Sequence, residues 1–223
     1  MAESETVLVP TSDTEKSPGV HYVTSKAEEL DFCYSLPDKI FQLSLGQNAH
    51  FSNAMFHGDF SMTLQEGQDA KVDYIAKMLG IKEGSKVIDL GCGWGGILQR
   101  LKQVHKADVT GVVLAKAQYK HCRDTGLNVH LGDMREVTPD DYGTFDAVVA
   151  SGSFDHVLSY EDFLAGKKEQ IYTEWFDMVA DLLPIGGRYY MQTMTFGRKI
   201  IPCLLYTSPS PRDLSTSRMP SSA

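Results

Sequence analysis

The sequence predicts an α/β fold with a doubly wound, mostly parallel β-sheet, and two observations carry this prediction. The first is an apolar run that ends in a glycine-rich turn and an amphipathic segment, in the string VIDLGCGWGG at 87–96. The second is the regular alternation of short apolar runs with amphipathic segments after this string. Such alternation places a helix between successive strands, which is the connection that parallel strands need.

Two amphipathic helices are expected before the glycine-rich turn, at 27–45 and 64–79. Both segments carry apolar residues at three- and four-residue spacing, so that each helix has one apolar face. Gly80 is expected to end the second helix, and Gly84 to turn the chain into the first strand.

After the turn in the sequence, alternating helices and strands are expected as far as position 193. Pro184 and the glycine pair after it mark the end of the last helix. Together with the strand before the turn, the segments give a sheet of five strands. In order, they are a helix at 97–104, a strand at 109–113, a helix at 116–124, strands at 129–131 and 145–150, a helix at 168–183 and a strand at 188–193.

The 223-residue chain has an ordinary globular composition, with 42% hydrophobic and 22% charged residues. Its net charge of −8 and the lack of a Lys/Arg-rich block argue against a nucleic-acid partner. No apolar run approaches the roughly 18 residues that span a bilayer, and residues 1–22 are expected to form a disordered arm without a signal-peptide core. The four cysteines lack metal-ligand spacing, so we expect no metal site and a reduced, cytoplasmic compartment.

Residues 203–223 are rich in Ser and Pro and show no periodic apolar pattern. One interpretation is a disordered C-terminus. Back-translation, however, matches a transposase-type sequencing adapter read in frame over both halves, so we interpret the segment as an adapter-derived, non-native tail. On this interpretation the native chain stops early, near Pro202, and the sheet lacks its last strands. The rest divides into a helical N-terminal lid segment at 23–80 and an incomplete core at 81–202.

Two classes of cofactor compete for the glycine-rich turn. A nicotinamide site needs an acidic residue about twenty positions on, but counting from Gly91 reaches GVVL at 111–114, which has no carboxylate. Instead, Asp89 precedes the first glycine by two positions. The order D-x-G-x-G resembles motif I of the class I S-adenosylmethionine methyltransferases, which have a Rossmann-like sheet. A tight strand-to-helix turn without a ligand is the structural alternative.

Further strings resemble the cyclopropane-fatty-acyl-phospholipid synthase family, which includes the mycolic acid methyltransferases. The matches follow the family's order over about residues 30–200. They are HFSNAMF at 50–56, the turn with its Trp94, GVVLAKAQ at 111–118 and SFDHV at 153–157. The resemblance implies transfer of a methyl or methylene group from S-adenosylmethionine to an unsaturated lipid acyl chain. Peripheral membrane contact would be one way to reach such a chain.

The resemblance also assigns residues to the methionine end of the cofactor. It places Asp89 near the methionine amino group or its waters. It lines the methionine and ribose end with three residues that lack side chains, Gly91, Gly93 and Gly95. Ser52 matches a residue near the cofactor carboxylate, although a surface serine would look the same.

Other residues are assigned to the nucleoside end. Gln118 matches the residue that contacts the ribose hydroxyls, and a solvated glutamine at a helix start is the alternative. Asp133 follows the third strand, where the family places a group on the adenine amino group, and a loop-capping Asp is the alternative. Trp94 either packs on the cofactor or wedges the helix against the sheet.

The sequence departs from the family at the residues that hold a base. Ring-forming members bind a bicarbonate ion through a cysteine, a glutamate and a histidine, where this chain has Asn53, Asp155 and Gln192. Methylation of an alkene gives a carbocation, and a base must remove a proton to close the ring. Asp155 and His156 are the titratable candidates nearby, or ring closure has given way to plain methylation. Retention of bicarbonate is therefore doubtful.

Two alternatives remain open for the function. One is a small-molecule N- or S-methyltransferase of the same fold, since a heteroatom nucleophile needs less assistance from a base. The other is a non-catalytic fragment that binds S-adenosylmethionine. The sequence does not specify an oligomeric state.

Overall fold

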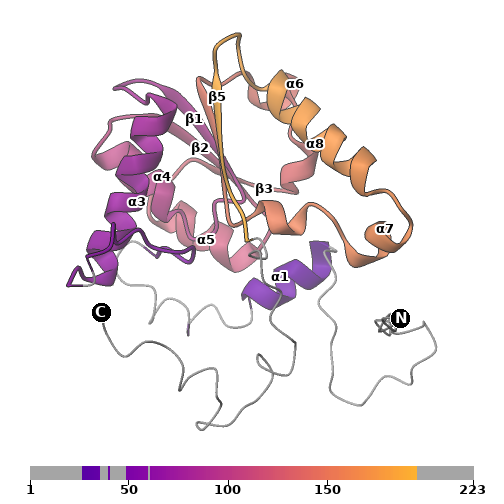
Figure 1. Cartoon of the computed structure of the whole chain (residues 1–223), viewed down its shortest axis with the longest axis horizontal. Coiled ribbons are helices and arrows are strands. Elements are labelled where there is room, and N and C mark those ends of the chain that lie inside the picture. Colours follow the sequence, from indigo (N-terminus) through magenta and orange to yellow (C-terminus); the bar gives the residue numbers. More distant parts are fainter. Residues whose placement is uncertain (1–26, 36–39, 41–48, 60, 195–223) are drawn as a thin grey trace, which may run out of the picture.

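The computed structural model describes residues 27–35, 40, 49–59 and 61–194 (Figure 1). The expected disordered arm and the adapter-derived tail lie outside the described residues, as does most of the region between 36 and 48.

In the part of the chain that the structure describes, one sheet of five parallel strands forms the centre, in the order β3-β2-β1-β4-β5. The strands are β1 (Lys86–Leu90), β2 (Asp108–Val113), β3 (Val129–Leu131), β4 (Ala147–Ser151) and β5 (Arg188–Gln192). The chain winds outward from β1 in one direction and then returns to lay β4 on its other side. The predicted doubly wound parallel sheet is confirmed, and its order reverses between β1 and β4, where such sheets bind ligands.

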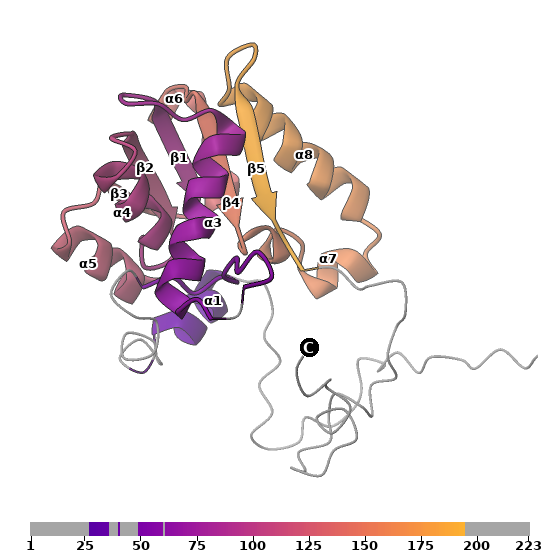
Figure 2. The same ribbon diagram turned by 60° about the vertical axis from the view of Figure 1, so that its left-hand side comes forward.

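Helices cover both faces of this sheet. The elements outside the sheet are α1 (Ala27–Ser35), α3 (Leu64–Leu79), α4 (Gly96–Gln103), α5 (Lys116–Asp124), α6 (Pro139–Tyr142), α7 (Tyr160–Leu164) and α8 (Lys168–Asp181), with 3-10 turns η1 (Met134–Glu136) and η2 (Phe154–His156). Figures 1 and 2 show α3 and α8 on opposite sides of the sheet. Among the described residues, no helix is both long and apolar enough to cross a bilayer.

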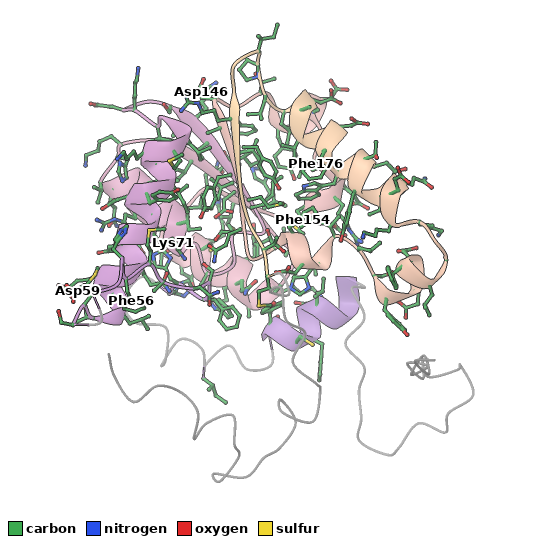
Figure 3. The ribbon with its side chains drawn as sticks, viewed as in Figure 1. Phe56, Asp59, Lys71, Asp146, Phe154 and Phe176 are labelled. Carbon is green, nitrogen blue, oxygen red and sulfur yellow. The ribbon has the colours of Figure 1, made fainter. Side chains whose placement is uncertain are left out.

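The two faces of the sheet form two separate cores, because successive side chains of a strand point in opposite directions. Val87 of β1 packs with the apolar residues of α3 and α4, whereas its neighbour Ile88 packs with Trp175 and Val179 of α8. Phe154 extends the second core, since its ring centroid lies 5.9 Å from that of Trp175 (Figure 3). The central strands β1 and β4 are thus buried on both sides, as their continuous apolar runs require.

Local signals in the sequence explain the bounds of α3. Thr63 and Glu66 form a reciprocal capping box, in which the Thr63 backbone N–H donates to Glu66 Oε2 at 2.7 Å. Gly80 takes the left-handed conformation, with φ at 69°, and its N–H bonds the last carbonyls of the helix. The helix predicted at 64–79 is therefore confirmed at both ends.

Other predicted elements differ from the structure at their ends. The strand predicted from 145 begins at Ala147, because the Phe145 N–H instead donates to the Leu182 carbonyl beyond α8. The short helices α6 and α7 were not predicted, since four and five residues are too few to show a helical period. Their N-caps, Thr138 and Ser159, each accept a hydrogen bond from the N–H three residues on.

Gly111 lies in the middle of β2, where the packing leaves no room for a side chain. A Cβ atom there would lie 2.6 Å from Leu98 Cδ1 and 2.7 Å from Cys92 Sγ. Replacement Gly111→Ala is therefore expected to lower the free energy of unfolding by about 1–3 kcal/mol, measured by urea denaturation.

Gly132→Ala is the matched control, because a Cβ atom at that position meets nothing within 4 Å. Its expected effect is within about 0.5 kcal/mol. Equal stability of the two variants would contradict this account of Gly111.

Candidate functional site

A cavity of about 400 Å³ opens at the carboxyl ends of the strands. The segments that follow all five strands contribute to its wall, and the N-terminal part of the chain closes one side through α1 and residues 49–53. Its position at the carboxyl edge, across the β1–β4 junction, is the one that parallel doubly wound sheets use for ligands.

The structure brings the predicted site residues together around this cavity, with one exception. The lining includes Ser52, Asn53, Asp89, Gly91, Gly93, Trp94, Gln118, Asp133, Asp155, His156 and Gln192. The exception is Gly95, which faces the core: a Cβ atom there would lie 2.4 Å from Leu127 Cδ1. Gly95 thus makes room for packing under the turn and does not line the cavity wall.

The turn after β1 presents its backbone to the cavity. Gly91 has a φ of +86°, and a Cβ atom on it would lie 2.4 Å from Ser153 Cβ. The N–H groups of Gly91 and Cys92 both donate to the Val112 carbonyl, at 2.9 and 3.0 Å. The turn is therefore held against β2, with Gly91 and Gly93 in the cavity wall.

Gln118 and Asp133 stand on the side of the cavity formed by the ends of β2 and β3. Gln118 is only 5% exposed, so the alternative of a solvated glutamine is wrong. Asp133 is the N-cap of η1 and accepts hydrogen bonds from the Arg135 backbone and guanidinium, so it has the capping role as well as a place in the wall. Burial opposes its ionisation, but the hydrogen bonds from Arg135 hold the pKa of Asp133 below its usual range.

Asp155 and His156, the two base candidates, have different surroundings. Asp155 is exposed, and its carboxylate accepts hydrogen bonds from the Thr193 hydroxyl and the Met194 N–H at the end of β5. His156 is half-buried, and its Nε2 lies 3.1 Å from the Tyr34 hydroxyl of α1. Burial lowers the pKa of His156, with an opposing effect from Asp155, so the imidazole stays neutral to a lower pH than usual.

Aromatic rings gather beside His156. The Tyr34 ring lies edge-on to His156, Phe51 and Trp94, with centroid distances of 6.0, 6.2 and 6.4 Å. Phe51 and Trp94 are themselves 6.0 Å apart. All four residues line the cavity, so Trp94 belongs to this aromatic cluster at the cavity wall.

Helix α1 is attached to the site by polar contacts with α5. The N-cap of α5 is Ala115, which has no side-chain group to cap the helix. Asp31 of α1 supplies the missing acceptor, because its Oδ1 accepts from the Lys116 N–H at 2.8 Å. The Ser35 hydroxyl accepts from the next N–H, that of Ala117, at 3.3 Å.

A buried lysine behind the cavity wall was not predicted from the sequence. Lys71 lies on α3, is 2% exposed, and donates from Nζ to Ser52 Oγ at 2.5 Å (Figure 3). Burial lowers the pKa of Lys71 to about 8, although the nearby Asp89 opposes the shift. A signal was present, because Lys71 shares the face of Ile75 and Leu79 at four-residue spacing, where an apolar residue would be expected.

Asp89 is the second buried charge, at 1% exposure. Its Oδ1 has no hydrogen-bond partner among the described residues. Burial raises the pKa of Asp89 to about 7, despite the opposing positive charge of Lys71. The carboxyl group is thus held at the cavity wall with unused capacity to accept a hydrogen bond.

Replacement Asp89→Asn is expected to stabilise the ligand-free protein at alkaline pH. The folded state holds the Asp89 proton more tightly than the unfolded state, so stability falls as pH rises from about 4 to about 7. Asn cannot ionise, and the variant should gain roughly 2 kcal/mol more over the wild type near pH 8 than near pH 5. Urea denaturation at the two pH values measures this difference.

The control is Asp108→Asn, which changes an exposed carboxylate at the start of β2 and should show no such dependence on pH. A variant at Asp89 that is less stable than the wild type near pH 8 would contradict the assignment of a strained carboxylate.

Known proteins are similar in sequence to about three quarters of this chain. S-adenosylmethionine-dependent methyltransferase UmaA of Mycobacterium tuberculosis is 30% identical over 173 residues, which cover 77% of this chain and 58% of that protein. Cyclopropane mycolic acid synthase 1 of the same organism is 31% identical over 166 residues, covering 73% and 54%. The chain therefore spans little more than half the length of these relatives.

Solved structures show the same fold. Cyclopropane synthase MmaA2 from Mycobacterium tuberculosis superposes with a TM-score of 0.67 at 25% identity, over 89% of this chain and 66% of that one. Mycolic acid cyclopropane synthase CmaA1, complexed with SAH and CTAB, gives a TM-score of 0.61 at 27% identity, over 83% and 61%. The family model described as mycolic acid cyclopropane synthetase matches residues 21–200. This chain belongs to the mycolic acid cyclopropane synthetase family.

Proposed function

We propose that the protein binds S-adenosylmethionine and transfers its methyl carbon to an unsaturated lipid acyl chain. One observation carries the proposal: a single cavity joins the backbone of the glycine turn at Gly91 and Gly93 and the buried Asp89 to the aromatic cluster of Tyr34, Phe51 and Trp94. A charged cofactor end and an apolar acceptor chain need these two environments side by side. The name of UmaA and the SAH bound to CmaA1 support the same cofactor.

The predicted residues divide along the cofactor. Asp89 would accept from the methionine ammonium, and the backbone at Gly91 and Gly93 would lie along the methionine and ribose. Gln118 would meet the ribose hydroxyls, because its side chain is largely buried yet lines the cavity. Asp133 would meet the adenine amino group from the cavity wall, where the Arg135 backbone and guanidinium already donate to both of its oxygens and fix its position.

The proposed methyl transfer creates a positive charge on the acceptor chain, and the site must stabilise this charge. When bound, S-adenosylmethionine supplies an electrophilic methyl group, so that attack by an alkene leaves a carbocation on the acceptor chain. The faces of Tyr34, Phe51 and Trp94 carry negative potential and would stabilise this charge without forming a bond to it. Their fixed positions would also align the acceptor carbon.

The proton released afterwards needs an acceptor at the same end of the cavity. Asn53 and Gln192 are amides and do not take up a proton at neutral pH. The Asp155 carboxylate already accepts hydrogen bonds from Thr193 and Met194, just after β5. We therefore assign the role to His156, whose neutral imidazole lies beside Tyr34 within the aromatic cluster.

Expression in a host with unsaturated phospholipids tests the function. Mass spectrometry of extracted lipids should show acyl chains heavier by one CH₂, and calorimetry should show binding of S-adenosylhomocysteine. Variant Asp89→Asn should lose most of both signals, whereas Asp108→Asn should keep them. Unchanged lipids together with cofactor binding would exclude the acyl substrate and leave the cofactor assignment standing.

A small-molecule N-methyltransferase is the second candidate, because the exposed carboxylate of Asp155 at the cavity wall would also bind an amine in its protonated form. Loss of that proton to a base would then free the nitrogen lone pair to attack the methyl group. The same cells supplied with amines would then yield methylated amines and unmodified lipids.

The pH dependence of transfer tests the role of His156. Because burial lowers its pKa, the imidazole remains an effective base below pH 6.5, and activity should fall only at a pH lower than this. Variant His156→Gln should lose about 10²–10⁴-fold in rate and the acidic limb of the profile. His130→Gln, an exposed histidine outside the cavity lining, is the control. An unchanged acidic limb in His156→Gln would assign the base elsewhere.

A further inference from the structure

We propose that Lys71 is a positioning residue that acts through Ser52 to hold the carboxylate of the methyl donor, so that Lys71 and Asp89 together recognise the two charges of its amino-acid end. The inference rests on the proposed function, since it names how the same cavity selects the polar end of that cofactor.

The geometry makes Ser52 the intermediary. Ser52 lines the cavity, while Lys71 lies behind it with its ammonium 2.5 Å from Ser52 Oγ. An ammonium group can only donate, so the Ser52 oxygen must accept from it. The hydroxyl proton of Ser52 is then free to point away from Lys71, toward the cavity. Ser52 thereby becomes a hydrogen-bond donor with a positive charge directly behind it.

A neighbouring serine supports this direction of donation. Ser151 Oγ lies 3.0 Å from Gln192 Oε1, an oxygen that can only accept. The Ser151 hydroxyl therefore donates its proton to Gln192. The Ser151 oxygen lies 3.4 Å from Ser52 Oγ and is at most a distant acceptor for the Ser52 hydroxyl. A bound carboxylate would be a nearer and stronger acceptor for the Ser52 proton.

Asp89 supplies the opposite charge on the same wall. Its carboxylate lines the cavity, and each of the two buried charges, Asp89 and Lys71, favours the ionised form of the other. An α-amino acid carries its ammonium and carboxylate on one carbon, so it presents two opposite charges close together. A ligand of this kind would satisfy the open oxygen of Asp89 and the free proton of Ser52 at once.

Two other buried polar groups lie around Lys71. Gln68, one turn earlier on α3, donates to the Ser52 carbonyl at 2.6 Å and so fixes the backbone of that residue. Burial lowers the pKa of His50 to about 3, with further lowering by Lys71 and Arg100, so His50 adds no positive charge. The positive charge behind Ser52 is therefore that of Lys71.

The test compares S-adenosylhomocysteine with its decarboxylated analogue, which lacks only the carboxylate. Calorimetry on Lys71→Met should show about a 10- to 100-fold weaker affinity for S-adenosylhomocysteine and a clearly smaller loss for the analogue, which is affected only through the weaker ionisation of Asp89. Lys77→Met, an exposed lysine on the same helix, should change neither affinity. A general loss of structure would weaken the binding of both ligands alike, so the ratio of the two affinities reports on the carboxylate alone.

Ser52→Ala approaches the same interaction from the cavity side and removes no buried charge. It should show the same selective loss, and the double variant should lose no more than either single variant, because Lys71 acts through Ser52. Equal weakening of both ligands, or losses that add in the double variant, would overturn the proposal while leaving the cofactor assignment intact. A wild-type protein that binds neither ligand would overturn the proposed function as well.

Discussion

The carboxylate of Asp89, buried at the end of the central strand, is the constraint around which the site is organised. A pKa of about 7 for a carboxyl group corresponds to roughly 4 kcal/mol of unfavourable free energy when it is ionised at alkaline pH. Among the residues that the structure describes, only Lys71 offsets this charge from nearby, and Lys71 is itself shifted toward the neutral form by burial. The protein thus maintains two incompletely compensated charges at a cavity, which is typical of sites whose ligand completes the compensation.

The turn after β1 adds a second constraint on the site, because two of its glycines have no room for a side chain. Gly91 must lack a side chain because Ser153 occupies that space, and Gly95 must lack one because Leu127 does. The first requirement concerns the cavity wall and the second concerns the packing of α4 and α5. The same short string therefore serves two neighbouring purposes, although both glycines look alike in the sequence.

The fold was predictable because its signals are local and repeated. The buried strands, the glycine turn and the capped helix at Leu64–Leu79 each carry a pattern that packing did not override. The cavity lining was largely predictable too, since the carboxyl ends of parallel strands must meet at one edge. Lys71 was not found, although it shares the apolar face of α3 with Ile75 and Leu79, because one lysine does not interrupt the apolar period of that face. The short helices α6 and α7 were missed because their only signals are the caps Thr138 and Ser159.

The capping of α5 by Asp31 has a thermodynamic consequence. The first turn of α5 carries Gln118 in the cavity wall, and its leading N–H groups are bonded by α1, a helix distant in the sequence. Docking of α1 and ordering of this turn are therefore linked equilibria. Any molecule that binds more tightly when the turn is ordered must strengthen the attachment of α1 by the same factor, and each change that loosens α1 must weaken that binding in equal measure.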